Sequence, residues 1–203
     1  SDLDEVLRGW MERLLAGKTP AEIRLDLVEA SRRRKNPALA ALLARYESTR
    51  SPGDPTARWR DVLAGGDAEA GRAIFRDKAE VNCVKCHRLD GKGGEVGPEL
   101  TGIGGRKTRE YLLESLVEPN RQIAQGFDTV VVSTVDGHIH AGVLKEENDQ
   151  RIELMTPEAR RIAIPKDQID QRSRGKSAMP DNAVEKLTPM ELRNLLEFLA
   201  GLK

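Results

Sequence analysis

The sequence has few aromatic residues, few cysteines and no excess of charge of either sign. Aromatic residues make up 3% of its 203 residues, and 33 Lys and Arg balance 33 Asp and Glu. A neutral chain lacks the electrostatic attraction that draws proteins to nucleic acids and to anionic membranes. No apolar run approaches the roughly 20 residues that span a bilayer. We therefore expect no nucleic-acid partner and no transmembrane segment in this chain.

Two cysteines are too few for a framework of several disulfides, and they lie only three positions apart. The hydrophobic fraction of 38% is sufficient for a core, so we expect a folded chain. The length fits one large domain or two small ones. Because the chain begins at Ser1 on an amphipathic segment, we interpret it as a processed or excised piece.

Helix signals divide the chain into an N-terminal helical extension, residues 1–64, and a second domain, residues 65–203. In the extension, apolar residues recur at the three- and four-residue spacing of amphipathic helices. Capping residues, several of them followed by proline or by glutamate three positions later, predict where helices begin. The predicted N-caps are Thr19, Asn36, Asp67, Thr108 and Thr188.

Residues 127–165 change period and are rich in β-branched side chains. Turn pairs such as Asp136-Gly137 and Asn148-Asp149 separate four short runs, which predicts a small antiparallel meander. The predicted strands are Phe127–Val135, Ile139–Lys145, Arg151–Thr156 and Ala159–Ile164. The fold class is thus mainly α, a helical domain with an inserted β meander, preceded by a short helical-bundle extension.

The most informative motif is Cys83-Val84-Lys85-Cys86-His87. Cys-x-x-Cys-His is the haem c attachment signature, in which two thiols bond to the porphyrin and the imidazole reaches the iron. The spacing suits this chemistry, since cysteines three apart lie on one side of a helical turn. Zinc is a weaker alternative, because it needs four ligands and the other soft candidates, His138 and His140, are far along the chain. A thioredoxin-like redox pair would need a strand-to-helix junction, which the pattern does not indicate.

A haem iron that cycles electrons needs a sixth ligand, and methionine is the usual one. Met179 lies in the irregular segment Ser177-Ala178-Met179-Pro180, which makes it the predicted distal ligand. Core packing is the expected role of the other methionines. They are Met11, Met155 and Met190. A bis-histidine iron using His138 or His140 remains open at this point.

Residues 66–203 resemble a class I c-type cytochrome, and specifically the haem-binding domain found at the C-terminal end of large multidomain bacterial proteins. The resemblance rests on ordered features along the whole second domain. They are Gly71 and Phe75, the Cys83–His87 motif, Gly97-Pro98-Glu99-Leu100, the Thr108 to Val117 helix, Ala178-Met179-Pro180, and Leu195 with Phe198.

The resemblance implies a first and last helix that cross near Gly71 and Phe75. It also implies one covalent haem c per chain, bound through Cys83 and Cys86. The carbonyl of Pro98 would orient His87, and Leu100 would pack on the haem face. Arg106, which follows the glycine loop, is our candidate for a propionate contact. One departure is the 92 residues from His87 to Met179, an excess that corresponds to the β insertion.

The leading hypothesis is one-electron transfer by an iron held between His87 and Met179, with no side chain acting as an enzyme's acid, base or nucleophile. Redox donor and acceptor proteins, or a fused dehydrogenase module, are the expected partners. The resemblance implies a bacterial periplasmic or cell-surface location. The alternative is a gas sensor or peroxidase-like haem protein with a displaceable distal ligand. A structural adaptor, with haem as a staple, is a third possibility.

Overall fold

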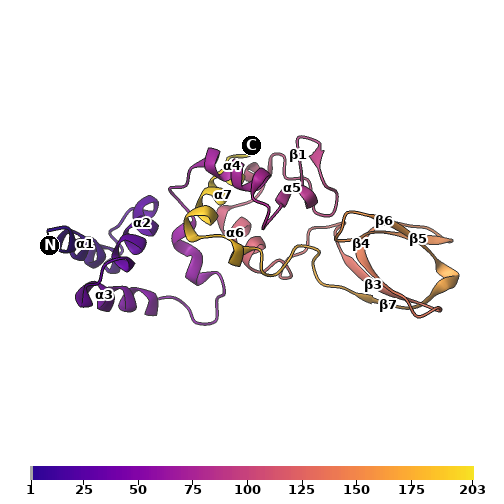
Figure 1. The fold of residues 1–203 in the computed structure, drawn as a ribbon, viewed down its shortest axis with the longest axis horizontal. Helices are drawn as coiled ribbons and strands as arrows, with labels where there is room; N and C mark the ends of the chain where they lie inside the picture. Colours follow the sequence, from indigo (N-terminus) through magenta and orange to yellow (C-terminus); the bar gives the residue numbers. More distant parts are fainter. Residues whose placement is uncertain (1) are drawn as a thin grey trace.

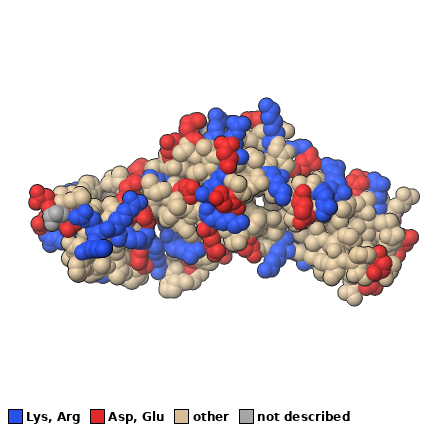
Figure 2. Space-filling view, in the orientation of Figure 1, with Lys and Arg blue, Asp and Glu red and all other residues tan. Residues whose placement is uncertain are grey.

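The computed structural model describes residues 2–203, and residue 1 of the predicted extension lies outside them. Three regions follow one another along the long axis: the N-terminal helices, a central group of helices, and a curled β-sheet at the far end (Figure 1). On the face shown in Figure 2, positive and negative side chains intermingle over the helical regions. The chain runs from one end to the other and then returns, because its last helix lies in the central group.

The N-terminal extension consists of α1 (Asp2–Leu15), α2 (Ala21–Arg32), α3 (Pro37–Ser48) and the 3-10 helix η1 (Ala57–Val62). Helices α1 to α3 share an apolar core of their own. It comprises Leu7, Met11, Leu14, Leu27, Val28, Leu39 and Leu43. Leu25 instead joins the core of the central helices. Asp26 adds an ion pair, 2.7 Å from Oδ2 to Nη1 of the buried Arg193, so α2 docks on the last helix.

Four of the five predicted N-caps are present, and one is wrong. The side chains of Asn36, Asp67, Thr108 and Thr188 each accept backbone N–H groups at the starts of their helices. Thr19 does not cap α2, because that helix begins at Ala21 and Pro20 occupies the cap position. The Thr19 hydroxyl is buried without a hydrogen-bond partner among the described residues.

The central group contains the helices that the resemblance implies. They are α4 (Ala68–Asp77), the single turn α5 (Cys83–Cys86), α6 (Arg109–Val117) and α7 (Pro189–Gly201). Short pieces join them: the hairpin β1 (Arg88–Leu89) and β2 (Lys92–Gly93), and the 3-10 helices η2 (Ile103–Gly105) and η4 (Val184–Lys186). Leu192, Leu195 and Leu196 of α7 are almost fully buried, so this helix forms the centre of the core.

Helices α4 and α7 cross where the sequence analysis placed them. A Cβ added to Gly71 would lie 2.0 Å from the carbonyl oxygen of Asn194, so only glycine allows this approach. The rings of Phe75 and Phe198 meet beside it, with centroids 5.6 Å apart. The crossing of the first and last helices is confirmed.

The β insertion is a five-stranded antiparallel sheet with the order β6-β5-β4-β3-β7. Its strands are β3 (Thr129–Thr134), β4 (Ile139–Glu147), β5 (Arg151–Met155), β6 (Arg161–Pro165) and β7 (Ile169–Arg174), with the 3-10 turn η3 (Lys166–Gln168) before β7. The predicted meander stopped at residue 165 and missed β7. Most of β7 is polar and exposed because it is an edge strand, so it lacks the alternation that marks a half-buried strand.

The missed strand brings the chain back to the point where the sheet begins. Strand β7 pairs with β3, the first strand of the sheet. The backbone N–H of Gly175 donates to the carbonyl of Thr129 over 2.7 Å, so the chain leaves the sheet where it entered. The segments 118–128 and 175–188, which connect the sheet to the helices, are therefore brought together beside α6.

Candidate functional site

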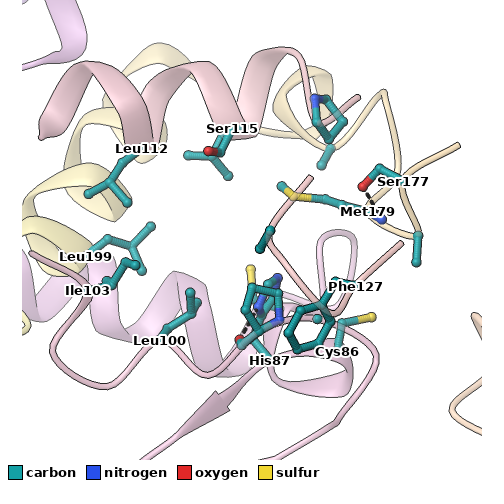
Figure 3. A pocket seen from close by; sticks show the side chains of 18 of the residues that line it. Cys86, His87, Leu100, Ile103, Leu112, Ser115, Phe127, Ser177, Met179 and Leu199 are labelled. Atoms are coloured by element: carbon teal, nitrogen blue, oxygen red, sulfur yellow. Dashed lines mark hydrogen bonds between the residues drawn. The ribbon is translucent and has the colours of Figure 1, made fainter. Parts of the chain in front are cut away.

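A cavity of about 320 Å³ lies between the central helices and the two segments that connect them to the sheet. Leu112 and Leu116 of α6 and Leu195 and Leu199 of α7 form part of its apolar lining. Figure 3 shows these helices on one side and the turn with Cys86 and His87 on another. An apolar, partly enclosed cavity suits a planar hydrophobic cofactor.

The two cysteines lie on α5, the single helical turn that the spacing predicted. Cys83 and Cys86 are free, and both line the cavity. Asn82, just before the turn, adopts a left-handed backbone conformation with φ 43°, which Asn tolerates better than most residues. Burial raises the pKa of the Cys83 thiol to about 11 and also raises the pKa of Cys86. A redox-active cysteine pair has a lowered thiol pKa, so these thiols do not fit the thioredoxin-like alternative.

His87 follows the turn and is held by the loop of residues 94–100. Its Nδ1 lies 2.9 Å from the carbonyl oxygen of Pro98. Because a carbonyl only accepts, Nδ1 carries the proton, and Nε2 is left with a lone pair for a ligand. Burial lowers the pKa of His87, which favours the neutral ring. The predicted contact with Pro98 is present.

Gly97 places the loop directly against the His87 ring. A Cβ at this position would lie 2.5 Å from Cε1 of His87, closer than side-chain atoms normally approach. The N–H of Gly97 also donates to the carbonyl of Cys86 over 2.7 Å. The loop therefore fixes the imidazole from its Nδ1 edge and from one side of the ring.

Met179 lines the cavity and lies across it from His87 (Figure 3). Its N–H donates to Oγ of Ser177 over 3.2 Å. The N–H of Ser177 in turn donates to Oδ1 of Asn120 over 2.7 Å. Asn120 also donates from Nδ2 to Asp181, so one side chain in the segment that follows α6 binds the methionine segment on both sides of Met179.

The structure places the remaining predicted site residues around the same cavity. Leu100 and Arg106 both line it. The guanidinium of Arg106 donates to the carbonyl of Thr101 over 2.9 Å, which holds this side chain at the rim. Phe127 lies close to Cys86 in Figure 3 and was missed as a site residue, since its apolar character fitted the start of a strand.

The alternative iron and zinc ligands lie elsewhere. His138 and His140 are absent from the cavity lining. The His138 side chain is 72% exposed, and its Nδ1 lies 3.0 Å from a carboxylate oxygen of Asp136. Within residues 2–203, no group of three or more Cys, His, Asp or Glu side chains could hold a metal ion, which removes the basis for zinc.

The residues present fit a covalently bound haem. Two free thiols, a neutral imidazole with its Nε2 available and a thioether share one apolar cavity. The Cys-x-x-Cys-His turn and the backing of its histidine by a carbonyl are features of the c-type cytochromes.

Comparison with known proteins agrees with these features. Residues 68–133 match the cytochrome c family model. The chain is 38% identical to cytochrome c of Arabidopsis thaliana over 63 residues, which are 30% of this chain and 53% of the plant protein. It is 40% identical to cytochrome c of Cochliobolus lunatus over 58 residues, 28% of this chain and 50% of that protein. These comparisons support a class I c-type cytochrome.

The similarity covers one part of the molecule. The chain spans about half the length of these relatives, and 66% of the cytochrome c type-1 of Ascaris suum, to which it is 33% identical over 78 residues. Met179 and the three N-terminal helices lie outside the residues matched by the family model. Among residues 2–203, no helix is long and apolar enough to cross a membrane.

Proposed function

We propose that this chain is a mono-haem c-type cytochrome that transfers one electron at a time and is not itself an enzyme. The observation that carries the proposal is the arrangement of Cys83, Cys86 and His87 across one apolar cavity from Met179. When bound, the haem supplies an iron that alternates between the ferrous and ferric states. The similarity of residues 68–133 to cytochrome c supports the same proposal.

In this proposal each residue of the site has one task. The sulfurs of Cys83 and Cys86 bond covalently to the edge of the haem. Nε2 of His87 would hold the iron, and the carbonyl of Pro98 keeps that ring in place by accepting a hydrogen bond from Nδ1. The thioether of Met179 would be the second ligand, and hydrogen bonds to Ser177 and Asn120 hold its segment. Leu100 packs on the haem face, and Arg106 faces a propionate.

A high reduction potential follows from this ligand set. A thioether favours the ferrous state, and the apolar lining disfavours the additional charge of the ferric state. The same apolar walls would keep water away from a bound haem.

We also propose a setting for the domain. Haem attachment to this motif requires reduced thiols, and the family resemblance points to a bacterial periplasmic or cell-surface protein. In that setting the domain is the C-terminal part of a larger multidomain protein, and a fused dehydrogenase module or separate redox proteins supply and accept the electron. To test this setting, cells are separated into fractions and the full-length protein with its haem is detected. The setting predicts that it occurs in the periplasmic or cell-surface fraction.

The experiment that tests the function compares optical spectra of haem-loaded protein with and without Met179. We expect the ferric protein to show the weak red absorption band of methionine-bound iron. Met179→Ala should remove the band and allow the ferrous protein to bind carbon monoxide. Met190→Ala is the matched control, because Met190 packs on the same core without lining the cavity.

Two other outcomes would contradict the proposal. If the unmodified protein already binds carbon monoxide, the distal side is open, and the gas-sensor or peroxidase-like alternative is preferred. If correctly matured protein carries no covalent haem, the cytochrome assignment is wrong.

A further inference from the structure

The β-sheet contacts the cavity through a small apolar cluster that is separate from the sheet's own core. Val143 of β4 and Met155 of β5 are 0% and 5% exposed, and they pack with Val96, which is 2% exposed. Cys86, Phe127 and Ala178 pack against this cluster. We call these six residues the seam. Two of them belong to the sheet, and the other four belong to the walls of the site.

Two seam residues, Cys86 and Ala178, are sequence neighbours of the two proposed iron ligands. Cys86 precedes His87, and Val96 precedes Gly97, whose backbone lies against the His87 ring. Ala178 precedes Met179 on the opposite side of the cavity. The sheet therefore packs against residues that are one or two positions away from the contacts that orient His87 and Met179. Because packed side chains transmit displacement, a shift of the sheet would move both walls.

Polar contacts reinforce the same junction. Glu95, next to Val96, forms ion pairs with Arg88, one residue after His87, and with Arg161 of β6. The Arg161 contact is 2.7 Å long. Lys145 of β4 lies over the ring of Phe127, with Nζ 4.3 Å from the ring centroid. Three strands of the sheet therefore contribute side chains to the junction.

The sheet's own core offers a contrast. It consists of Val130, Val132, Ile152, Leu154 and Ile164. Val132 of β3 is 0% exposed, like Val143, yet it packs only within the sheet cluster. Neither valine lines the cavity, but Val143 shares a cluster with residues of the cavity wall and Val132 does not.

We propose that the β-sheet braces the haem site and that Val143 is its central positioning residue, holding residues 94–98 and 176–180 at a fixed separation. This inference rests on the proposed function, because the two segments carry the contacts of His87 and Met179. In this arrangement the sheet limits how easily Met179 leaves the iron. The β-sheet would therefore control how easily small molecules such as carbon monoxide reach the Met179 side of the cavity.

The test compares Val143→Ala with Val132→Ala in the full, haem-loaded chain. Hydrogen exchange measured by mass spectrometry reports the protection of residues 94–98 and 176–180. Val143→Ala should accelerate exchange in both segments by about tenfold and raise the rate of carbon monoxide binding to the ferrous protein. Val132→Ala removes the same two methyl groups and should accelerate exchange within the sheet alone.

Equal effects of the two variants on both segments would overturn the proposal, as would unchanged protection in Val143→Ala. Val143→Thr provides a second variant if the alanine variant does not fold, since it keeps the shape and places a hydroxyl in the seam. Staining for covalent haem keeps the two proposals apart. If the parent protein carries no haem, the proposed function fails, but the exchange comparison still tests the brace, because the seam consists of protein side chains alone.

Discussion

The two walls of the cavity are built in different ways. The wall with Cys83, Cys86 and His87 comes from one continuous stretch, residues 82–100, and it lies inside the region that matches cytochrome c. The wall with Met179 comes from two segments, 118–128 and 175–187, which are separated by the whole β-sheet. A local motif can define the first wall, whereas the second depends on β7 returning beside β3. The predictions below test this difference, from the largest expected effect to the smallest.

The largest expected effect is the loss of covalent haem when both thiols are removed from the wall with Cys83, Cys86 and His87. We expect Cys83→Ala combined with Cys86→Ala to abolish covalent haem attachment, because no other cysteine is present in the chain. Haem staining after denaturing electrophoresis measures this directly. Each single variant is the control and should retain one bond. Covalent haem on the double variant would show that the attachment site has been assigned wrongly.

Adding a methyl group at Gly97 should displace His87 without removing any ligand. The added Cβ would lie 2.5 Å from the imidazole, so Gly97→Ala should lower haem incorporation and cost about 1–3 kcal/mol of unfolding free energy. Gly105→Ala is the control, since its Cβ would meet only Lys203, at 4.0 Å. Urea unfolding and haem content are measured together. Equal behaviour of the two variants would mean that the loop does not hold the ring.

Loss of the Asn120 side chain should loosen the wall with Met179. Asn120→Ala removes the hydrogen bonds to Ser177 and Asp181, and it should cost about 0.5–1.5 kcal/mol while increasing carbon monoxide binding. Asn148→Ala is the control, because Asn148 holds a turn at the remote end of the sheet through two backbone N–H groups. Stopped-flow carbon monoxide binding checks the prediction. Faster binding in the control variant would contradict a local role for Asn120.

A smaller, pH-dependent effect is expected where α6 joins α7. Two hydrogen bonds from Arg109, of 2.7 and 2.8 Å, hold the pKa of Glu197 below its usual range. Because the folded-state pKa is depressed, this stabilisation is fully present above the unfolded pKa of about 4.3 and is lost as the pH falls through the lower folded-state pKa. Glu197→Gln should therefore cost on the order of 1 kcal/mol at pH 7 and progressively less as the pH falls through the depressed pKa of Glu197.

Denaturant unfolding of the parent and of Glu197→Gln at several pH values tests this coupling. Glu69→Gln is the matched control, since Glu69 is 82% exposed and lies 3.9 Å from Arg72. A stability difference that stays constant from pH 7 to pH 3 would show that the ion pair is not its source.

The helical framework could be predicted because its signals are local. The cap residues Asn36, Asp67 and Thr188 each precede an amphipathic run, and hydrogen bonds within three residues decide where those helices begin. Thr19 carried the same signal and failed, because Pro20 took the cap position instead. Strand β7 was missed because its residues are mostly polar and exposed. It forms a strand through its backbone pairing with β3, and that pairing leaves no pattern in the sequence.

The site shows the same division between local and long-range information. The turn at Cys83 and Cys86 spans four residues, so the spacing of the motif predicts it. The contact of Pro98 with His87 joins residues 11 positions apart, and the family resemblance implied it. Phe127 and the seam around Val143 depend on contacts between segments far apart in the chain. Such contacts leave no periodic pattern, and for that reason no sequence signal identified them.

From the order of its residues alone, this chain specifies its helices, the haem-attachment turn and the histidine that follows, because hydrogen bonds and side-chain spacing within a few residues are enough. The position of Met179 across the cavity from His87 was decided by folding. It requires the chain to leave the helical domain at residue 129, form five strands and return at residue 175, with the seam joining sheet to site. The distance between Met179 and His87 is set only by the packing of segments that are far apart in the chain.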